Sequence, residues 1–297
     1  MKKRWLLNLV MLALIAGLVT FLYSRPKSEN AAETKYEVSQ LKLADITSAK
    51  VEFPAQAPVS FEKVDGLWRM TAPYKTRADQ ISVQRILAII AATSKEKFPT
   101  TDLAKFGLDN PQLKLTLSGA GASNVFTFGT YNTVTEEQYV SFKDAIYLLS
   151  GSYSEAAKTQ PIELVDKSPL KPNEAKQIAG FDFSRLEQWQ DTRMNVDMTD
   201  GKWSTNVAKA KITQNEMNEW LDFSWKQAQA KSVELYTPDH KETYPSLDVK
   251  LKDGKKVHFD KISEAPELLL GRPDEGILYH FANDIGFNML NPPLNNQ

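Results

Sequence analysis

The most constraining feature of this sequence is a pattern that occurs twice, at an offset of 135 residues. Asp65-Gly66-Leu67-Trp68 recurs as Asp200-Gly201-Lys202-Trp203, each time after a run of alternating apolar and polar residues. Because both Asp and Gly tolerate positive φ, an Asp-Gly pair between alternating runs predicts a β-hairpin. The sequence therefore predicts two related units, each containing such a hairpin.

A helix is predicted after each hairpin. Asp79 and Thr213 each precede apolar residues at the spacing of a helix with one buried face. Either residue can cap the first helical turn, Thr213 within a capping box that Glu216 completes. Pro111 and Pro245 then introduce further alternating strands. The predicted fold class is α+β: two duplicated units follow an N-terminal transmembrane helix, each an antiparallel sheet with one main helix packed on a face.

The N-terminus predicts a membrane anchor. Residues 5–23 form an uncharged, mostly apolar run that would rise about 28 Å as a helix, close to the roughly 30 Å hydrocarbon core of a bilayer. Cations on its N-terminal side favour a cytoplasmic N-terminus and a periplasmic bulk, as for a single-pass protein of the bacterial inner membrane. The residues that determine this topology are Lys2, Lys3 and Arg4. The residues expected to hold the anchor in the bilayer are Trp5, Leu6, Leu12, Ile15, Phe21 and Tyr23.

A cleaved signal peptide is the alternative for this segment. Signal peptides have a shorter apolar stretch, which ends in small residues at the cleavage site. Here the run is longer and closes on Thr20-Phe21-Leu22-Tyr23, which favours an uncleaved anchor.

The domain boundaries follow from these patterns. Residues 24–34 are polar and lack an apolar period, as expected of a tether. Ser168-Pro169 and Lys171-Pro172 mark the boundary between the two units. The predicted segments are the cytoplasmic stub and anchor at 1–24, the tether at 25–42, the first α+β repeat at 43–150, a connector at 151–172 and the second repeat at 173–297.

Composition excludes several classes of function. The 36 basic and 37 acidic side chains nearly cancel, so the chain lacks the basic excess that nucleic-acid binding requires. Cysteine is absent, which excludes disulfides, thiolate zinc sites and cysteine nucleophiles.

No catalytic, cofactor-binding or metal-ligating residue is predicted. The three histidines, His240, His258 and His280, do not have the spacing that places two imidazoles on one metal. Two acidic pairs, Glu136-Glu137 and Asp274-Glu275, are expected in solvated turns. The glycines at 119 and 121 begin like a dinucleotide fingerprint, but a strand-like segment follows them, so we predict a hairpin turn there. No cofactor and no small-molecule ligand are identified.

The segment Leu103-Ala104-Lys105-Phe106-Gly107-Leu108-Asp109-Asn110-Pro111 carries a family resemblance. Together with Asp65-Gly66-Leu67-Trp68, Phe128-Gly129 and Tyr139-Val140, it resembles the bacterial domain-of-unknown-function family 4340 over most of residues 43–290. In the second unit Tyr236-Thr237-Pro238-Asp239-His240 replaces the Phe-Gly-Leu element. The resemblance implies a membrane-anchored envelope protein without assigned activity. Members often accompany gliding-motility-type ABC transporter components, which implies an accessory role.

The leading functional hypothesis is a non-enzymatic, membrane-tethered periplasmic module for binding or assembly, accessory to an ABC-type envelope transporter complex. Its expected partners are the lipid bilayer and a membrane protein. An envelope glycan-binding or glycan-processing protein is one alternative, which needs carboxylates or exposed aromatic residues gathered in a cleft between the units. A purely structural spacer is the other.

Overall fold

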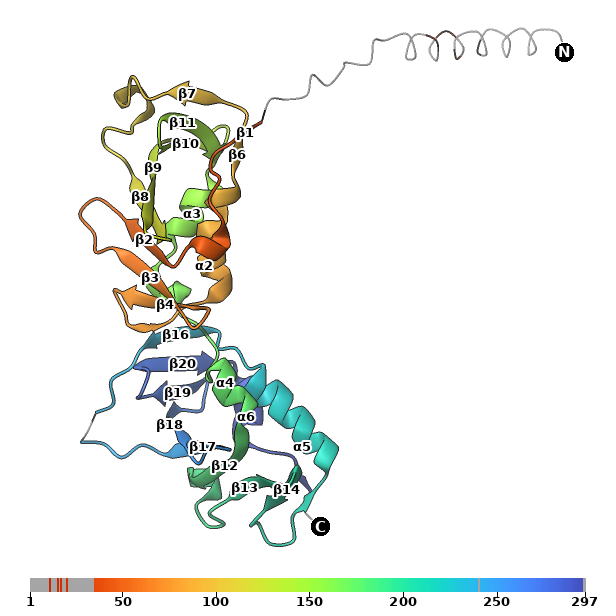
Figure 1. The fold of residues 1–297 in the computed structure, drawn as a ribbon. Helices are drawn as coiled ribbons and strands as arrows, with labels where there is room; N and C mark the ends of the chain where they lie inside the picture. The colour runs from red at the N-terminus through yellow and green to blue at the C-terminus, as the bar shows by residue number, and fades with distance from the viewer. Residues whose placement is uncertain are drawn as a thin grey trace, which may run out of the picture.

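The computed structural model describes residues 35–239 and 241–295, together with residues 11, 15, 17 and 20. The described chain forms two sheet-rich halves stacked end to end (Figure 1). Buried apolar side chains from both halves form one continuous cluster. The halves therefore share a core across their junction.

The first half is built on an antiparallel sheet with the strand order β5-β4-β3-β2-β8-β9-β10-β11-β7. Its strands are β2 (Ser48–Glu52), β3 (Val59–Val64), β4 (Leu67–Ala72), β5 (Thr76–Arg77), β7 (Lys97–Pro99), β8 (Leu113–Gly119), β9 (Ala122–Asn132), β10 (Glu137–Phe142) and β11 (Ala145–Ser150). A separate small sheet pairs β1 (Tyr36–Glu37) with β6 (Thr93–Ser94).

The second half is built on an antiparallel sheet with the strand order β14-β13-β12-β17-β18-β19-β20-β16. Its strands are β12 (Ile178–Arg185), β13 (Asn195–Thr199), β14 (Lys202–Thr205), β16 (Ser232–Leu235), β17 (Ser246–Leu251), β18 (Lys256–Ser263), β19 (Leu268–Arg272) and β20 (Ile277–Phe281). A small sheet pairs β15 (Lys211–Ile212) with β21 (Leu294–Asn295).

The two large sheets have the same succession of strands. In each, a hairpin (β3–β4 or β13–β14) lies toward one end of the sheet, and a meander (β8 to β11 or β17 to β20) follows toward the other end. The strand just before the meander in the chain, β7 or β16, lies at the far edge. The hairpin turns are also alike: Asp65 and Gly66 have φ of 52° and 80°, and Asp200 and Gly201 have 52° and 75°. These values confirm the turns predicted from the two Asp-Gly pairs.

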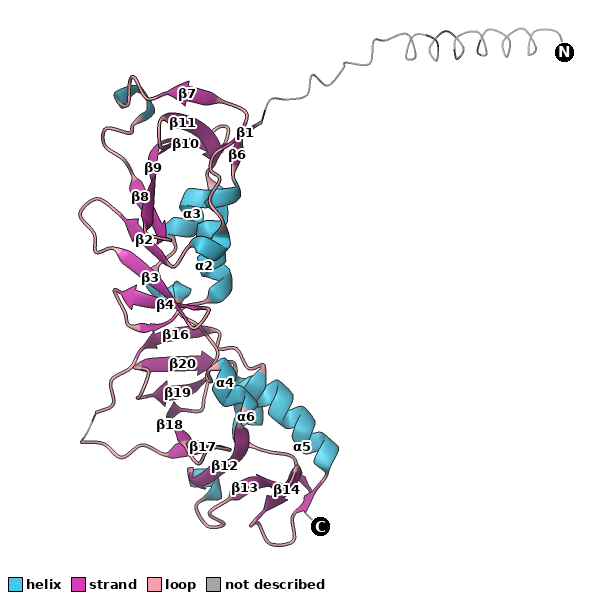
Figure 2. Ribbon diagram, in the orientation of Figure 1, coloured by secondary structure: helices cyan, strands magenta, loops and turns pink. Residues whose placement is uncertain are grey.

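Short helices accompany the sheets (Figure 2). The α-helices are α2 (Gln80–Leu87), α3 (Ser152–Lys158), α4 (Pro172–Lys176), α5 (Gln214–Leu221) and α6 (Asn283–Leu290). The 3-10 turns are η1 (Leu43–Asp45), η2 (Ala88–Ala91), η3 (Ala104–Phe106), η4 (Pro161–Leu164) and η5 (Glu187–Trp189), and a π-helical turn, η6 (Asp222–Lys226), extends α5. Asp79 caps α2 as predicted, because its carboxylate accepts the N–H of Ser82 at 2.7 Å. Thr213 makes no such bond at α5, so the predicted capping box does not form.

A glutamine at the start of each of these helices binds the hairpin strand beside it. Oε1 and Nε2 of Gln80 bind the N–H and C=O of Trp68 in β4, both at 2.9 Å. In the second half, Gln214 binds the same two groups of Trp203 in β14 at 2.7 and 3.0 Å. We call these contacts the glutamine clamps. Gln214 takes the place of a further strand beside the edge strand β14, whereas Gln80 adds to the backbone bond that the C=O of Trp68 accepts from Ala78.

The loop that carries the family motif packs on the first sheet. Phe106 and Leu108 form a small separate core with Ile146, in contact with Phe98 and Tyr139. Gly107 ends η3 with a φ of 66°. A Cβ on Gly129 of β9 would collide with the carbonyl oxygen of Phe106. The motif therefore has a structural role in this half.

The predicted fold class is wrong. Among the described residues the chain is mostly β-sheet with a few short helices, rather than α+β. The reason is local: the α-helical parts of α2 and α5 are eight residues each and continue only as one short 3-10 or π-helical segment, while the alternating segments continue into long strands such as the eleven-residue β9. The N-terminal transmembrane helix is also not supported. None of the described helices is long and apolar enough to cross a bilayer, and of the predicted anchor only residues 11, 15, 17 and 20 are described.

Candidate functional site

At the junction of the halves, Arg77 of β5 reaches into the second half. Its guanidinium donates to Glu275 at 3.0 Å and to the hydroxyl of Tyr279 at 2.9 Å, both from the β19–β20 hairpin. It also pairs with Asp166 and donates to the carbonyl oxygen of Ser168 at 2.6 Å. Burial opposes its charge, but Glu275, Tyr279 and Asp166 hold the pKa of Arg77 above its ordinary value. We call this set of contacts the Arg77 latch.

A second arginine, Arg272 at the end of β19, ties α4 to the same hairpin. Its side chain is fully buried, with 0 % exposed. Two of its nitrogens bind the carboxylate of Glu174 at 2.9 and 2.8 Å, and Asp274 accepts two further bonds at 2.9 and 3.0 Å. Bidentate arginine–carboxylate contacts are strong and geometrically specific. They fix the wall of the second half that faces the junction.

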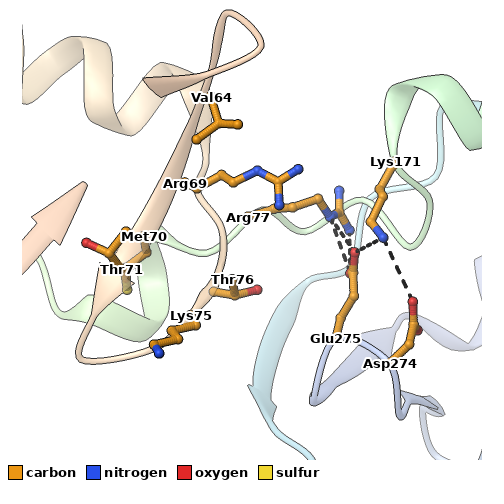
Figure 3. A pocket seen from close by; sticks show the side chains of 10 residues that line it. All are labelled: Val64, Arg69, Met70, Thr71, Lys75, Thr76, Arg77, Lys171, Asp274 and Glu275. Carbon is orange, nitrogen blue, oxygen red and sulfur yellow. Dashed lines mark hydrogen bonds and ion pairs between the residues drawn. The ribbon is translucent and has the colours of Figure 1, made fainter. Parts of the chain in front are cut away.

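The junction opens into a groove, which Figure 3 shows in part. One cavity of about 390 Å³ is lined from both halves. A second cavity of about 300 Å³ shares Val64, Arg69, Arg77 and Lys171 with the first. We call the two cavities the seam groove. Its exposed lining combines apolar side chains of the β3–β4 hairpin with cationic side chains from both halves.

The acidic pair Asp274-Glu275 lies at the seam groove. Burial would raise the pKa of Asp274, but its bonds to Arg272 lower it below the ordinary value. A general acid in glycoside hydrolysis needs the opposite shift. Asp274 is therefore unsuited to that role. The other predicted pair lies elsewhere: Glu136 and Glu137 stand at the β9–β10 turn of the first half and line no part of the groove.

His258 lies on an exposed strand position, but its ring is not free. Its Nδ1 is 2.7 Å from Asp248 and its Nε2 is 3.1 Å from Asp260. The bond to Asp248 is the main reason that the pKa of His258 is raised, and it outweighs the opposing effect of burial. Within the described ranges, no three His, Asp or Glu residues are arranged to hold a metal ion.

The remaining histidines differ in setting. His280 lies 3.6 Å from both Glu234 and Glu267, and its Nε2 is buried without a hydrogen-bond partner. His240 lies outside the described residues. The glycine segment at 119–122 forms the turn of the β8–β9 hairpin, as predicted, where Gly119 pairs with Ala122.

The predicted anchor is almost wholly outside the described residues. Ile15 is described and is exposed, in a helical conformation. The residues outside the description are Lys2, Lys3, Arg4, Trp5, Leu6, Leu12, Phe21 and Tyr23. Their roles stay predictions.

Sequence reasoning missed the side chains that shape the seam groove. Arg69 and Arg77 flank a proline turn in the first half, whereas Lys171 and Arg272 belong to the second. No local pattern connects them. The one available signal was the charge contrast between the acidic turn at 274–275 and the arginines near the first hairpin.

Comparisons with known proteins place most of the chain in one family. The family model described as "Domain of unknown function (DUF4340)" matches residues 68–273. Searches of curated proteins and of solved structures found no significant match. The matched residues include cationic side chains from both walls of the seam groove, such as Arg69 and Lys171, but neither Val64 and Leu67 nor the pair Asp274-Glu275.

Proposed function

This chain belongs to the DUF4340 family of domains of unknown function, and we propose that it is a binding and assembly module rather than an enzyme. The observation that carries the proposal is the seam groove. Its carboxylates at 274–275 are bound by arginines, while cationic and apolar side chains remain exposed in it. Such a surface suits holding a partner, and its two carboxylates at 274–275 are engaged by arginines rather than free to exchange protons.

We further propose that the module works in the periplasm at the bacterial inner membrane, as an accessory of an ABC-type envelope transporter complex. The support comes from the cationic and apolar composition of the first 24 residues and from the family resemblance. Confinement to a membrane surface would raise the effective concentration of the module near a membrane-protein partner.

The glycan-processing alternative is less well supported. It requires two carboxylates that flank a bond, one of them protonated. In the seam groove, Glu275 is bound by Arg77 and Asp274 by Arg272. A purely structural spacer would not need a groove of mixed charged and apolar lining.

Crosslinking of the full-length chain in native membranes, followed by purification in mild detergent, tests the binding function. We expect the chain to be recovered with a membrane-protein partner. Recovery of the chain only as a lone monomer would contradict the proposal. A reporter fused after Gln297 tests the location separately, and we expect it to be active in the periplasm and inactive in the cytosol.

A further inference from the structure

Two arginines lie opposite each other at the edge of the first sheet. Arg69 of β4 and Arg77 of β5 are direct cross-strand partners in the antiparallel ladder, so both project from the same face of the sheet. Like charges in this arrangement destabilise a sheet unless anions compensate them. Arg77 has its anions in Asp166 and Glu275. The side chain of Arg69 is exposed and forms no hydrogen bond or ion pair within residues 35–239 and 241–295, including with Glu62, its cross-strand neighbour on β3.

The opposite wall of the seam groove adds two lysines. Lys176, in the last turn of α4, is exposed and has no ion-pair partner in the described part of the chain. Lys171 lies 3.5 Å from Glu275 and 3.9 Å from Asp274, and both carboxylates are already held by arginines at shorter distances. The cavity that both lysines line with Arg69 and Arg77 contains two carboxylates of its own, Asp65 and Asp166. Its four cationic side chains therefore outnumber its carboxylates, and it faces solvent with an excess of positive charge.

The third component of the groove is apolar. Val64 and Leu67, on either side of the first hairpin turn, are 41 % and 43 % exposed. They line the same cavity as Arg69 and Lys176, next to the buried Trp68. The groove thus places an apolar wall and unpaired cationic side chains in the same cavity.

We propose that the seam groove binds an acidic segment of a partner protein, in which a carboxylate lies beside an apolar side chain. The carboxylate pairs with Arg69, whose planar guanidinium suits a bidentate contact, and the apolar side chain packs on Val64 and Leu67. This inference rests on the proposed binding function and specifies the chemistry of the partner. A free phosphate would leave the apolar wall unused, and a flat bilayer fits a concave cavity between two halves poorly.

Binding of a labelled peptide to the full-length chain in detergent tests the proposal. The probe is a fluorescent peptide of alternating leucine and glutamate, and the comparison peptide has glutamine in place of glutamate. We expect the acidic peptide to bind at least tenfold more tightly, about the effect of one charge-assisted hydrogen bond, and its binding to weaken with added salt. Equal binding of the two peptides would overturn the proposal.

Two variants and a matched control locate the site. Arg69→Gln and Lys176→Gln should each weaken binding of the acidic peptide, Arg69→Gln by about tenfold. Arg85→Gln makes the same change at an exposed position on α2 outside the groove and should bind as the unmodified chain does. The proposal fails if Arg69→Gln behaves like Arg85→Gln. It also fails if phosphatidylglycerol vesicles, but not the peptide, bind in a way that depends on Arg69.

The crosslinking experiment separates this inference from the proposed function. If the unmodified chain captures a membrane-protein partner and Arg69→Gln with Lys176→Gln does not, both proposals are supported. If the double variant captures the partner equally well, the acidic-segment inference is overturned and the binding function stands. If the unmodified chain captures nothing, the binding function itself is overturned.

Discussion

His258 shows how a single ionisable side chain is controlled by its neighbours on the second sheet. Because Asp248 and Asp260 face its two ring nitrogens, the ring satisfies both carboxylates only as an imidazolium, which donates from both nitrogens. Asp248 is also held by Arg185 at 2.7 Å and by Lys256 at 3.3 Å. Although burial opposes this, the bonds to His258 and Arg185 hold the pKa of Asp248 below its ordinary value.

The raised pKa of His258 predicts a dependence of stability on pH. A histidine whose pKa is higher in the folded than in the unfolded chain stabilises the fold fully below its unfolded pKa, near 6.5. This contribution is lost as the pH rises through the folded pKa. We expect the free energy of unfolding to fall over that interval by less than about 1 kcal/mol, because the ring is partly exposed. Urea unfolding at a series of pH values measures the effect.

The variant His258→Gln provides the control, because its amide has no charge to lose. It should be less stable than the unmodified chain below pH 6.5 and should show a smaller change above it. An identical pH profile for the two chains would mean that the carboxylates around His258 do not set its charge.

The sequence allowed part of this residue-scale arrangement to be foreseen. The Asp-Gly pair in Lys252-Asp253-Gly254-Lys255 is typical of a hairpin turn, and counting outward from it pairs Asp248 with His258, as the sheet does. The outward position of His258 followed from alternation. The approach of Arg185 could not be foreseen, because it depends on how β12 pairs with β17 across a break in register.

At the scale of elements, local chemistry decided what was predictable. Asp-Gly turns and alternating strands depend on neighbouring residues, and both were recovered. The balance of helix and sheet was not, because the apolar spacing after Asp79 and Thr213 did not show that α2 and α5 stop after eight residues. The glutamine clamps were also missed. They require a helix to be placed against the edge of a hairpin that lies more than ten residues earlier in the chain.

The clamps predict matching effects in the two halves. Gln80→Ala leaves the N–H of Trp68 without this partner, while the C=O of Trp68 keeps the N–H of Ala78 at 3.3 Å. Gln214→Ala leaves both the N–H and the C=O of Trp203, on the edge strand β14, without these partners. We expect each to lower the free energy of unfolding by about 1–3 kcal/mol. Amide hydrogen exchange should accelerate at Trp68 in the first variant and at Trp203 in the second.

Asn215→Ala is the matched control for the clamps. Asn215 is exposed and adjacent to Gln214 on α5, so its removal should change stability by less than about 0.5 kcal/mol. Unchanged amide hydrogen exchange at Trp203 in the Gln214→Ala variant would show that water replaces the side chain of Gln214 with no loss of stability.

At the scale of the whole molecule, the junction depends on contacts between residues far apart in the chain. Arg77 and Glu275 are separated by 198 residues, so neither turn chemistry nor periodicity could connect them. The seam groove could not be predicted for the same reason, because each half contributes only one of its walls. The residues of the candidate site could therefore not be predicted from the sequence, which suggested only a cleft between the units.

A double-mutant cycle on the Arg77 latch tests whether this contact joins the halves energetically. Arg77→Met removes the closest counter-charge of the buried Glu275 and leaves it with Lys171 at 3.5 Å and Arg272 at 3.8 Å. We therefore expect a loss in urea unfolding that is smaller than the loss of about 3–5 kcal/mol for a buried charge with no partner. Adding Glu275→Gln should recover part of it, with a coupling energy of about 1–3 kcal/mol.

The exposed pair Lys50–Glu52 in the first half serves as a reference cycle. Its two side chains are 46 % and 42 % exposed, so their coupling should stay below about 1 kcal/mol. If the Arg77–Glu275 cycle gave a coupling energy no larger than this, the Arg77 latch would stabilise the junction no more than an exposed surface ion pair does.

The glutamine clamp of the second half also protects this molecule against aggregation through an edge strand. An outermost β-strand with open amides and carbonyls acts as a template on which another chain can polymerise. At β14, the amide and carbonyl of Trp203 are already occupied by Gln214, so an incoming strand would have to displace that side chain first. Loss of Gln214 would therefore expose a nucleus for fibrous aggregation at this end of the molecule.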